Sequence, residues 1–389
     1  MENLWLIGSI WIAIALAASM ISIRLGVSVA LVEITLGAAV GNLWPIPSTE
    51  WTDFLAKFGA VLLTFLAGAE IDHASLRADL KASLLIGLIA FLAPFLGVWA
   101  LAFWGLHWNT SEALIAGIAL STTSVAVVYA VLLENGLNRT RLGKLILAAC
   151  FINDLGTVLA LGAGFAAFGL RMLVFAAATL ICLYHLPGWT SLILEKVGRA
   201  RVSEPEAKFL LLVLFALGGL AAAANSEAVL PAYLVGLVTA EVLRSEDKLI
   251  ARLRSIAFGV LTPFYFIKAG LLISAPALLP AAGLVALFLG AKLLTKFVGV
   301  WPAARACGFP LRERNYTTLL MSTGLTFGTI SALFGLEAGI ISQSQYSVLV
   351  TVVVLSAVAP TLIAERFFRP GEEPESAQPA EPEMAAGSV

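Results

Sequence analysis

A single aspartate, Asp154, lies near the middle of a long apolar stretch, directly after Asn153. A carboxylate at the depth of a lipid bilayer is costly unless it faces protein or water, so such a residue indicates a functional site. Low dielectric favours the protonated form of a carboxyl group, and protonation can then compete with cation binding near neutral pH. Asp154 is therefore a candidate proton carrier, cation ligand, or both. A structural carboxylate bonded to neighbouring helices is the alternative.

Asn153 adds an uncharged oxygen beside this carboxylate. That oxygen suits a cation ligand and a hydrogen bond between helices equally well. A site that accepts either a proton or a cation, and never both, would be a minimal exchanger.

Four consecutive hydroxyl residues interrupt another apolar stretch, namely Ser121, Thr122, Thr123 and Ser124. One or two hydroxyls in a helix usually bond back to the preceding turn. Four in a row at bilayer depth predict a polar break, where freed carbonyls and hydroxyls can coordinate a small cation.

A second break is predicted in MSTGLTFGTI, which contains Ser322, Thr323 and Thr326 together with two glycines. Two interrupted helices in corresponding halves of a chain are typical of an inverted-repeat transporter with its site at the bilayer midplane. Close packing of helices through small residues is the alternative explanation for the glycines.

Three lysines also lie within apolar segments. Lys292 and Lys296 are four residues apart on one expected helix, so they share a face. We expect Lys296 to reach a carboxylate across the core or to offset the partial negative charge of broken-helix ends. The simplest explanation for Lys268 is an ion pair with a carboxylate such as Glu33 or Glu70.

The composition places these residues in a membrane protein. Of the 389 residues, 60% are hydrophobic and 13% are charged, with a mean hydropathy of +0.94. Soluble domains carry about 25% charged residues, so a polytopic membrane protein is expected. We find no basic patch for nucleic acid and no metal-ligand spacing among the three cysteines. No Walker A, nucleophile-elbow or zinc-helix motif is present, so neither an enzyme nor an ATP-driven pump is expected.

Apolar windows separated by polar or Gly/Pro breaks predict about thirteen transmembrane helices. The expected spans are residues 4–22, 27–45, 53–70, 83–106, 111–134, 142–167, 171–187, 207–224, 228–243, 256–274, 277–303, 315–334 and 345–366. Most of the 24 Lys and Arg residues fall in alternate loops. By the positive-inside rule the N-terminus is outside and the C-terminus is cytoplasmic, which requires an odd number of spans.

Five segments, in this order, resemble motifs of the monovalent cation:proton antiporter-2 family, of the NapA and Kef type. They are VEITLGAAVG, LLTFLAGAEID, TTSVAVVYAVLLENG, ACFINDLG and LTKFVGV. The resemblance covers nearly the whole chain except its acidic end. It implies an all-α inverted-repeat fold with two crossed broken helices, and a homodimer in which a mobile core moves like an elevator against a scaffold.

The same resemblance implies roles for individual residues. Asp154 matches the family's obligatory aspartate, which alternately holds proton and cation, and Thr123 and Ser124 match the unwound segment beside it. Lys296 is similar to the family's core lysine because Gly299 keeps the lysine–x–x–glycine spacing, while Lys292 is a competing assignment.

The chain departs from the family pattern at Asn153, where electrogenic members have a first aspartate. If Asp154 alone titrates, one proton returns per monovalent cation, and exchange should be electroneutral. The core lysine then lacks its usual acidic partner.

These observations predict a multi-pass inner-membrane antiporter that exchanges Na⁺, or alternatively K⁺, for H⁺ without a cofactor. Residues 1–368 form the expected exchanger domain and residues 369–389 a disordered acidic tail, too short for a nucleotide-binding domain. Membrane lipid and a second copy of the chain are the expected partners. The alternatives are an organic-anion transporter on the same fold, which a single deep carboxylate disfavours, and a cation channel or sensor without proton coupling.

Overall fold

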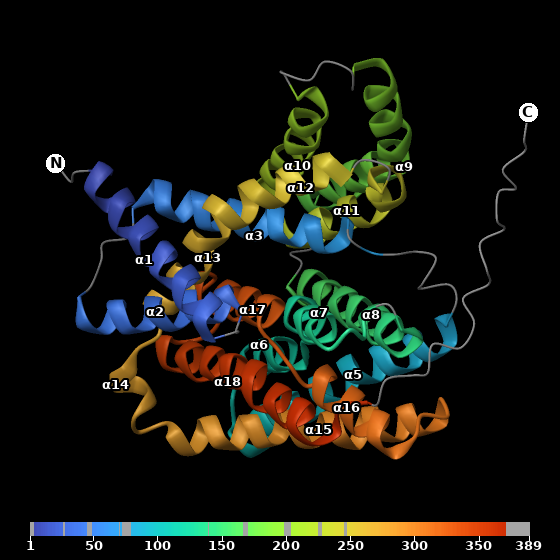
Figure 1. Cartoon of the computed structure of the whole chain (residues 1–389). Helices are drawn as coiled ribbons and strands as arrows, with labels where there is room; N and C mark the ends of the chain where they lie inside the picture. Colours follow the sequence, from blue (N-terminus) through green and yellow to red (C-terminus); the bar gives the residue numbers. More distant parts are fainter. Residues whose placement is uncertain are drawn as a thin grey trace, which may run out of the picture.

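The computed structural model describes residues 4–25, 28–44, 49–69, 71, 79–138, 140–165, 170–197, 204–224, 228–244 and 247–370. Within these residues the chain is all helical (Figure 1). In chain order the helices are α1 (Leu4–Leu25), α2 (Val29–Leu43), α3 (Glu50–Ala69), α5 (Leu80–Ala100, continued by the π-helical Leu101–Gly105), α6 (Thr110–Ser121), α7 (Val125–Glu134), α8 (Arg141–Gly164), α9 (Leu170–Val197), α10 (Pro205–Ala223), α11 (Val229–Leu243), α12 (Asp247–Ile256, continued by the π-helical Ala257–Leu261), α13 (Thr262–Leu271), α14 (Ala275–Leu278), α15 (Ala282–Ala306), α16 (Leu311–Met321), α17 (Thr326–Glu337) and α18 (Gln343–Phe368).

The described helices match the predicted spans. Eleven helical stretches are long and apolar enough to cross a membrane, and two shorter apolar helices, α2 and α11, complete the set. The tenth predicted span starts too late, because the helix begins with the basic, amphipathic α12, which an apolar window excludes. The seventh ends too early, because α9 continues through Pro187 to Val197. The acidic tail lies outside the described residues from residue 371 onwards.

Most of the helices form two groups. The core group comprises α5–α8 and α15–α18, which lie together in the lower part of Figure 1. The scaffold group comprises α1–α3 and α9–α13, with α3 and α9–α12 in the upper part of the same view. The short helix α14 connects the end of α13 to α15.

Glycines bring backbones close within each group. In the scaffold, Gly68 of α3 and Gly236 of α11 face each other's backbone so closely that a Cβ at either position would collide with a carbonyl oxygen. In the core, a Cβ at Gly87 of α5 would lie 2.7 Å from the carbonyl oxygen of Ala149 on α8. Helices inside membranes associate through such small residues, because backbones must approach closely for dispersion forces to hold them.

Side-chain caps begin several core-group helices. Asn109 accepts a hydrogen bond from the backbone N–H of Glu112 at the start of α6, and Ser342 does the same for Gln345 at the start of α18. Each pair forms a reciprocal capping box, which satisfies N–H groups that the helix itself leaves free. These caps define where the helices carrying the functional residues start.

Candidate functional site

Two predicted breaks are present, and they touch. Helix α6 ends at Ser121 and α7 begins at Val125, while α16 ends at Met321 and α17 begins at Thr326. The hydroxyl of Thr123 donates a hydrogen bond to the Met321 carbonyl over 2.8 Å, and the Ser124 N–H lies 3.4 Å from the hydroxyl of Thr323. The two interrupted helices therefore cross at their breaks.

Asn153 joins α8 to the first break. Its Oδ1 accepts a hydrogen bond from the Thr123 N–H over 2.9 Å, and its Nδ2 donates to the Ser121 carbonyl over 3.2 Å. The amide thus pairs one donor and one acceptor that the missing helical turn leaves free. Of the two roles considered for Asn153, the geometry favours the hydrogen bond between helices.

Asp154 follows on α8 and is 1% exposed. Its Oδ1 is buried and accepts no hydrogen bond from any described residue. Buried polar atoms are almost always paired, so an orphaned carboxylate oxygen needs an explanation such as a proton, an ion or a catalytic role. No direct ion pair joins Asp154 to Lys296, whose ammonium bonds Thr123 instead.

The two core lysines serve different breaks. Lys296 donates a hydrogen bond to the Thr123 hydroxyl over 3.0 Å at the first break. Lys292 donates to the Ser356 hydroxyl of α18 over 2.9 Å, and its ammonium lies against Gly324 at the second break. Both side chains are fully buried. Because Thr123 in turn bonds the last carbonyl of α16, the charge of Lys296 offsets the partial negative end of that helix.

Most of the other predicted hydroxyls donate hydrogen bonds to backbone carbonyls three or four residues earlier. Thr122 bonds the Ala119 carbonyl, Ser322 the Thr318 carbonyl and Thr323 the Leu320 carbonyl, over 3.1, 2.7 and 2.8 Å. The Ser124 hydroxyl accepts from the Val127 N–H over 3.4 Å and so caps α7. Thr326 starts α17 and is half-buried. Each hydroxyl oxygen keeps a lone pair for a further partner.

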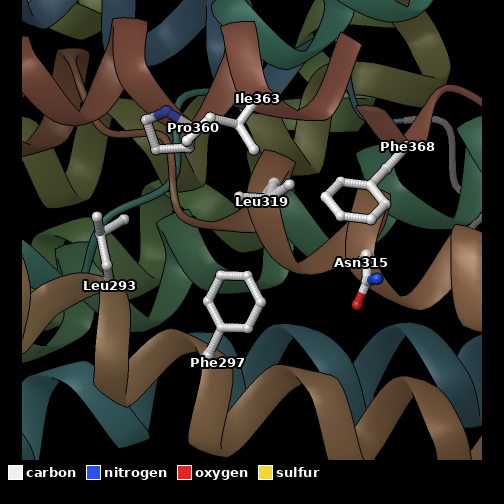
Figure 2. A pocket seen from close by; sticks show the side chains of 7 residues that line it. All are labelled: Leu293, Phe297, Asn315, Leu319, Pro360, Ile363 and Phe368. Carbon is white, nitrogen blue, oxygen red and sulfur yellow. The ribbon is translucent and has the colours of Figure 1, made fainter. Parts of the chain in front are cut away.

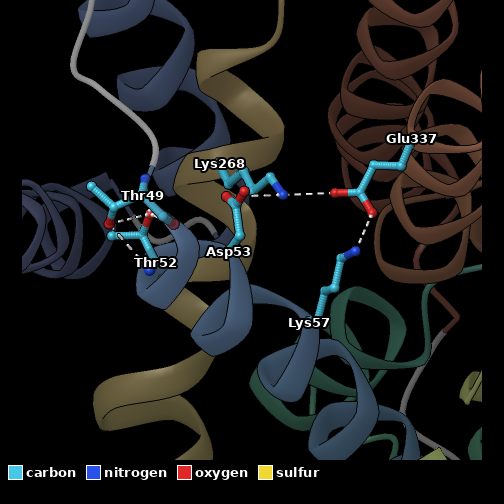
Figure 3. A network of polar contacts seen from close by, with 6 residues as sticks. All are labelled: Thr49, Thr52, Asp53, Lys57, Lys268 and Glu337. Atoms are coloured by element: carbon cyan, nitrogen blue, oxygen red, sulfur yellow. Dashed lines mark hydrogen bonds and ion pairs between the residues drawn. The ribbon is translucent and has the colours of Figure 1, made fainter. Parts of the chain in front are cut away.

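Lys268 pairs with carboxylates, as expected, but Glu33 is not one of them. Its ammonium pairs with Glu337 over 2.6 Å and with Asp53 over 3.2 Å (Figure 3). Glu33 is buried within α2 and its Oε2 has no described hydrogen-bond partner. Glu70 lies outside the described residues.

Two residues near the site were not predicted from the sequence. Ser356, which holds Lys292, is a lone hydroxyl in the apolar run VVVLSAVAP, and that interruption was its only signal. Tyr233 of α11 donates to the Phe151 carbonyl over 3.0 Å, one turn before Asp154. Its ring also makes an edge contact with Phe327 of α17. Nothing in the sequence near Tyr233 indicates this contact.

None of these residues lines the apolar cavity of about 310 Å³ between α15, α16 and α18 (Figure 2). Its lining contains Leu293, Phe297, Leu319 and other apolar side chains, with Asn315 as the polar member. The Oδ1 of Asn315 already accepts a hydrogen bond from the Trp301 indole over 2.9 Å. The cavity offers no carboxylate, so its lining does not suit a cation.

Comparison with known proteins identifies the family of this chain. Residues 12–368 match the family described as sodium/hydrogen exchanger, transmembrane. The chain belongs to this exchanger family. Similar curated proteins include the probable Na⁺/H⁺ antiporter 3 of Methanocaldococcus jannaschii. It is 26% identical to this chain, and the match covers 82% of this chain and 84% of the antiporter's length. The Na⁺/H⁺-K⁺ antiporter GerN of Bacillus cereus is 24% identical over 89% of this chain and 92% of its own. Such proteins are transporters rather than enzymes.

The exchanger fold is also shared with a solved structure. The sodium proton antiporter MjNhaP1 from Methanocaldococcus jannaschii, at pH 8, superposes with a TM-score of 0.67 and 14% identity. The match covers 92% of this chain and 94% of the other. The chain is therefore a multi-pass membrane protein with the antiporter fold, and the predicted fold class is confirmed.

Proposed function

We propose that this exchanger is a secondary active antiporter in which Asp154 alternately holds a proton and a monovalent cation. The observation that carries the proposal is the buried Oδ1 of Asp154, which no described group satisfies. An ionised carboxylate in that position needs a counter-charge, and a proton or a small cation supplies it. Relatives named as Na⁺/H⁺ and K⁺/H⁺ antiporters support both ions, with Na⁺ favoured.

The surroundings of Asp154 fit an alternating site. Lys296 is bonded to Thr123 rather than paired with the carboxylate, so Asp154 remains available for a cation. Carbonyls and hydroxyls at the adjacent break, including those of Thr122, Thr123 and Ser124, supply the uncharged oxygens that such a cation prefers. Within the described residues, no group of three or more His, Cys, Asp or Glu side chains gathers into a divalent-metal site.

Exchange is proposed to be electroneutral, with one proton returned per cation. Asn153 is uncharged and engaged by the first break, which leaves Asp154 as the carboxylate at the crossing. The core group would carry this site across the membrane against the scaffold group in an elevator movement. The N-terminus is proposed to lie outside and the C-terminus in the cytoplasm, in a homodimer of the inner membrane.

The test is cation-driven proton movement in proteoliposomes that contain a trapped pH dye. With the wild type, a gradient that drives Na⁺, K⁺ or Li⁺ into the vesicles should make the lumen more alkaline. A gradient that drives the cation out should make the lumen more acidic. The Asp154→Asn variant should lose this exchange while remaining folded. Cation flux that persists in the variant without proton coupling would identify a channel instead. Proton movement driven by an organic anion, and not by cations, would favour the organic-anion alternative.

A further inference from the structure

Glu337 links the core group to the scaffold group. It is the last residue of α17 in the core, and both of its ionic partners belong to scaffold helices. Lys57 of α3 lies 3.2 Å from its Oε2, and Lys268 of α13 lies 2.6 Å from its Oε1 (Figure 3). One carboxylate of the core is thus held by two ammonium groups of the scaffold.

The scaffold contributes a second carboxylate to the same cluster. Asp53, one turn before Lys57 on α3, lies 3.2 Å from the Lys268 ammonium. Two positive and two negative groups therefore balance one another. The side chain of Lys268 is only 9% exposed, whereas that of Glu337 is 31% exposed and that of Lys57 is 66% exposed.

This distribution suits a contact that opens repeatedly. Breaking a buried pair by removing one partner is costly, because an uncompensated charge remains in a dry place. Here Asp53 would stay with Lys268 when the core group leaves, so the most buried ammonium keeps a counter-ion. Glu337 and Lys57 are already exposed enough to pass into water.

Further polar contacts to core-group helix α18 lie at the same end, whereas the hydrogen bond from Tyr233 to the Phe151 carbonyl lies beside Asp154. The Tyr346 hydroxyl of α18 donates to the Ala269 carbonyl of α13 over 2.7 Å. Close by, the Ser274 N–H donates to the Ser347 hydroxyl over 2.9 Å, and the Gln343 amide bonds the Leu272 carbonyl. By the positive-inside assignment this end faces outside.

We propose that Glu337, with Lys57 and Lys268, forms an outer latch that holds the core group against the scaffold group and opens in each transport cycle. The proposal rests on the elevator antiport proposed above. The latch residues Lys57, Lys268 and Glu337 do not ligate the cation. They act as positioning residues, because they set the side of the membrane from which ions can reach Asp154.

The decisive experiment closes the latch covalently. Cysteines at positions 57 and 337 are joined by a short, reducible thiol-specific cross-linker in proteoliposomes. Exchange should fall at least tenfold on cross-linking and return on reduction. The control pair is Asp79, which precedes α5, and Arg141, the first residue of α8; their side chains pair over 2.6 Å within the core group. Cysteines cross-linked at these two positions should leave exchange within twofold.

The outcomes separate the latch from the transport proposal. Full exchange after complete cross-linking of positions 57 and 337 would overturn the latch while leaving antiport intact. Absence of cation-driven proton movement in the wild type would instead overturn the proposed function itself.

A second variant removes the latch without cross-linking. Glu337→Gln should open the outer side more often and raise labelling of a cysteine at position 333, one turn earlier on α17, by an external impermeant thiol reagent. Leu333 is 7% exposed in this structure, so the parent should label slowly. We expect at least a threefold rise with Glu337→Gln and no change with Asp79→Asn. Equal labelling in all three proteins would contradict the latch.

Discussion

The ammonium of Lys296 donates a hydrogen bond to the hydroxyl of Thr123 over 3.0 Å, although both come from distant parts of the chain. The Thr123 hydroxyl in turn donates a hydrogen bond to the Met321 carbonyl over 2.8 Å. One hydroxyl thus connects the core lysine, the first break and the end of the helix that leads into the second break. The crossing of the two broken helices depends on this short chain of donors.

Replacing Thr123 by Val should weaken this crossing. The change leaves the buried ammonium of Lys296 and the Met321 carbonyl without their partner, at a cost of about 1–3 kcal/mol for each unpaired group. We expect a lower unfolding temperature in detergent and at least tenfold slower exchange. The matched control, Thr123→Ser, keeps the hydroxyl and should stay within about twofold of the wild type. Equal stability of Val and Ser variants would show that the hydrogen bonds do not matter.

An aspartate at position 153 should change the charge moved per cycle. In the Asn153→Asp variant, a protonated carboxyl can still accept from the Thr123 N–H and donate to the Ser121 carbonyl, so the break survives. Two titrating groups then face one monovalent cation, and exchange should become sensitive to an imposed membrane potential. The wild type should respond little to the same potential. The voltage response of both proteins is measured by dye-based exchange with Na⁺ as substrate, while potassium and valinomycin set the membrane potential. A wild-type exchange rate that depends strongly on voltage would refute electroneutrality.

Close packing in the scaffold group predicts a position-specific loss of stability. In a Gly68→Ala variant the new Cβ would collide with the Tyr233 carbonyl, and backbone cannot yield as a flexible side chain can. Overpacking of this kind costs about 1–3 kcal/mol. Gly283→Ala is the control, since nothing lies within 4 Å of a Cβ there. Thermal unfolding should separate the two variants, and identical melting would argue against the close α3–α11 contact.

The ion pair between Asp79 and Arg141 predicts a small pH effect. The hydrogen bond from Arg141 holds the pKa of the Asp79 carboxyl below its usual value. A lowered folded-state pKa adds stability above the unfolded pKa of about 3.9, and this contribution disappears as the pH falls through the folded value. The Arg141 side chain is 79% exposed, so the Arg141→Gln variant should lose less than about 1 kcal/mol at pH 7.

The pH dependence provides the check on that pair. The difference in unfolding free energy between wild type and Arg141→Gln should shrink as the pH drops below about 4, because Asp79 is then protonated in the unfolded chain and, at lower pH, in the folded protein as well. A difference that grew in acid would mean that the arginine acts through another group.

Local signals in the sequence were enough for the helices and their interruptions. Apolar length reports whether a segment can cross a bilayer, and a run of hydroxyls reports a break, because both depend on residues adjacent in the chain. The breaks at Thr122–Ser124 and Ser322–Leu325 and the burial of Asp154 followed from such signals. The ends of α9 and α12 did not, since charged or proline-containing turns can continue a helix that an apolar window stops.

Partnerships across the fold required the tertiary structure. The sequence placed Lys292 and Lys296 on one face, but only the packed helices assign one to Ser356 and the other to Thr123. Likewise, Lys268 pairs with residues more than sixty positions away on either side. Spacing along a chain orders residues on one helix, whereas the partner of a buried charge depends on which other helix packs against it.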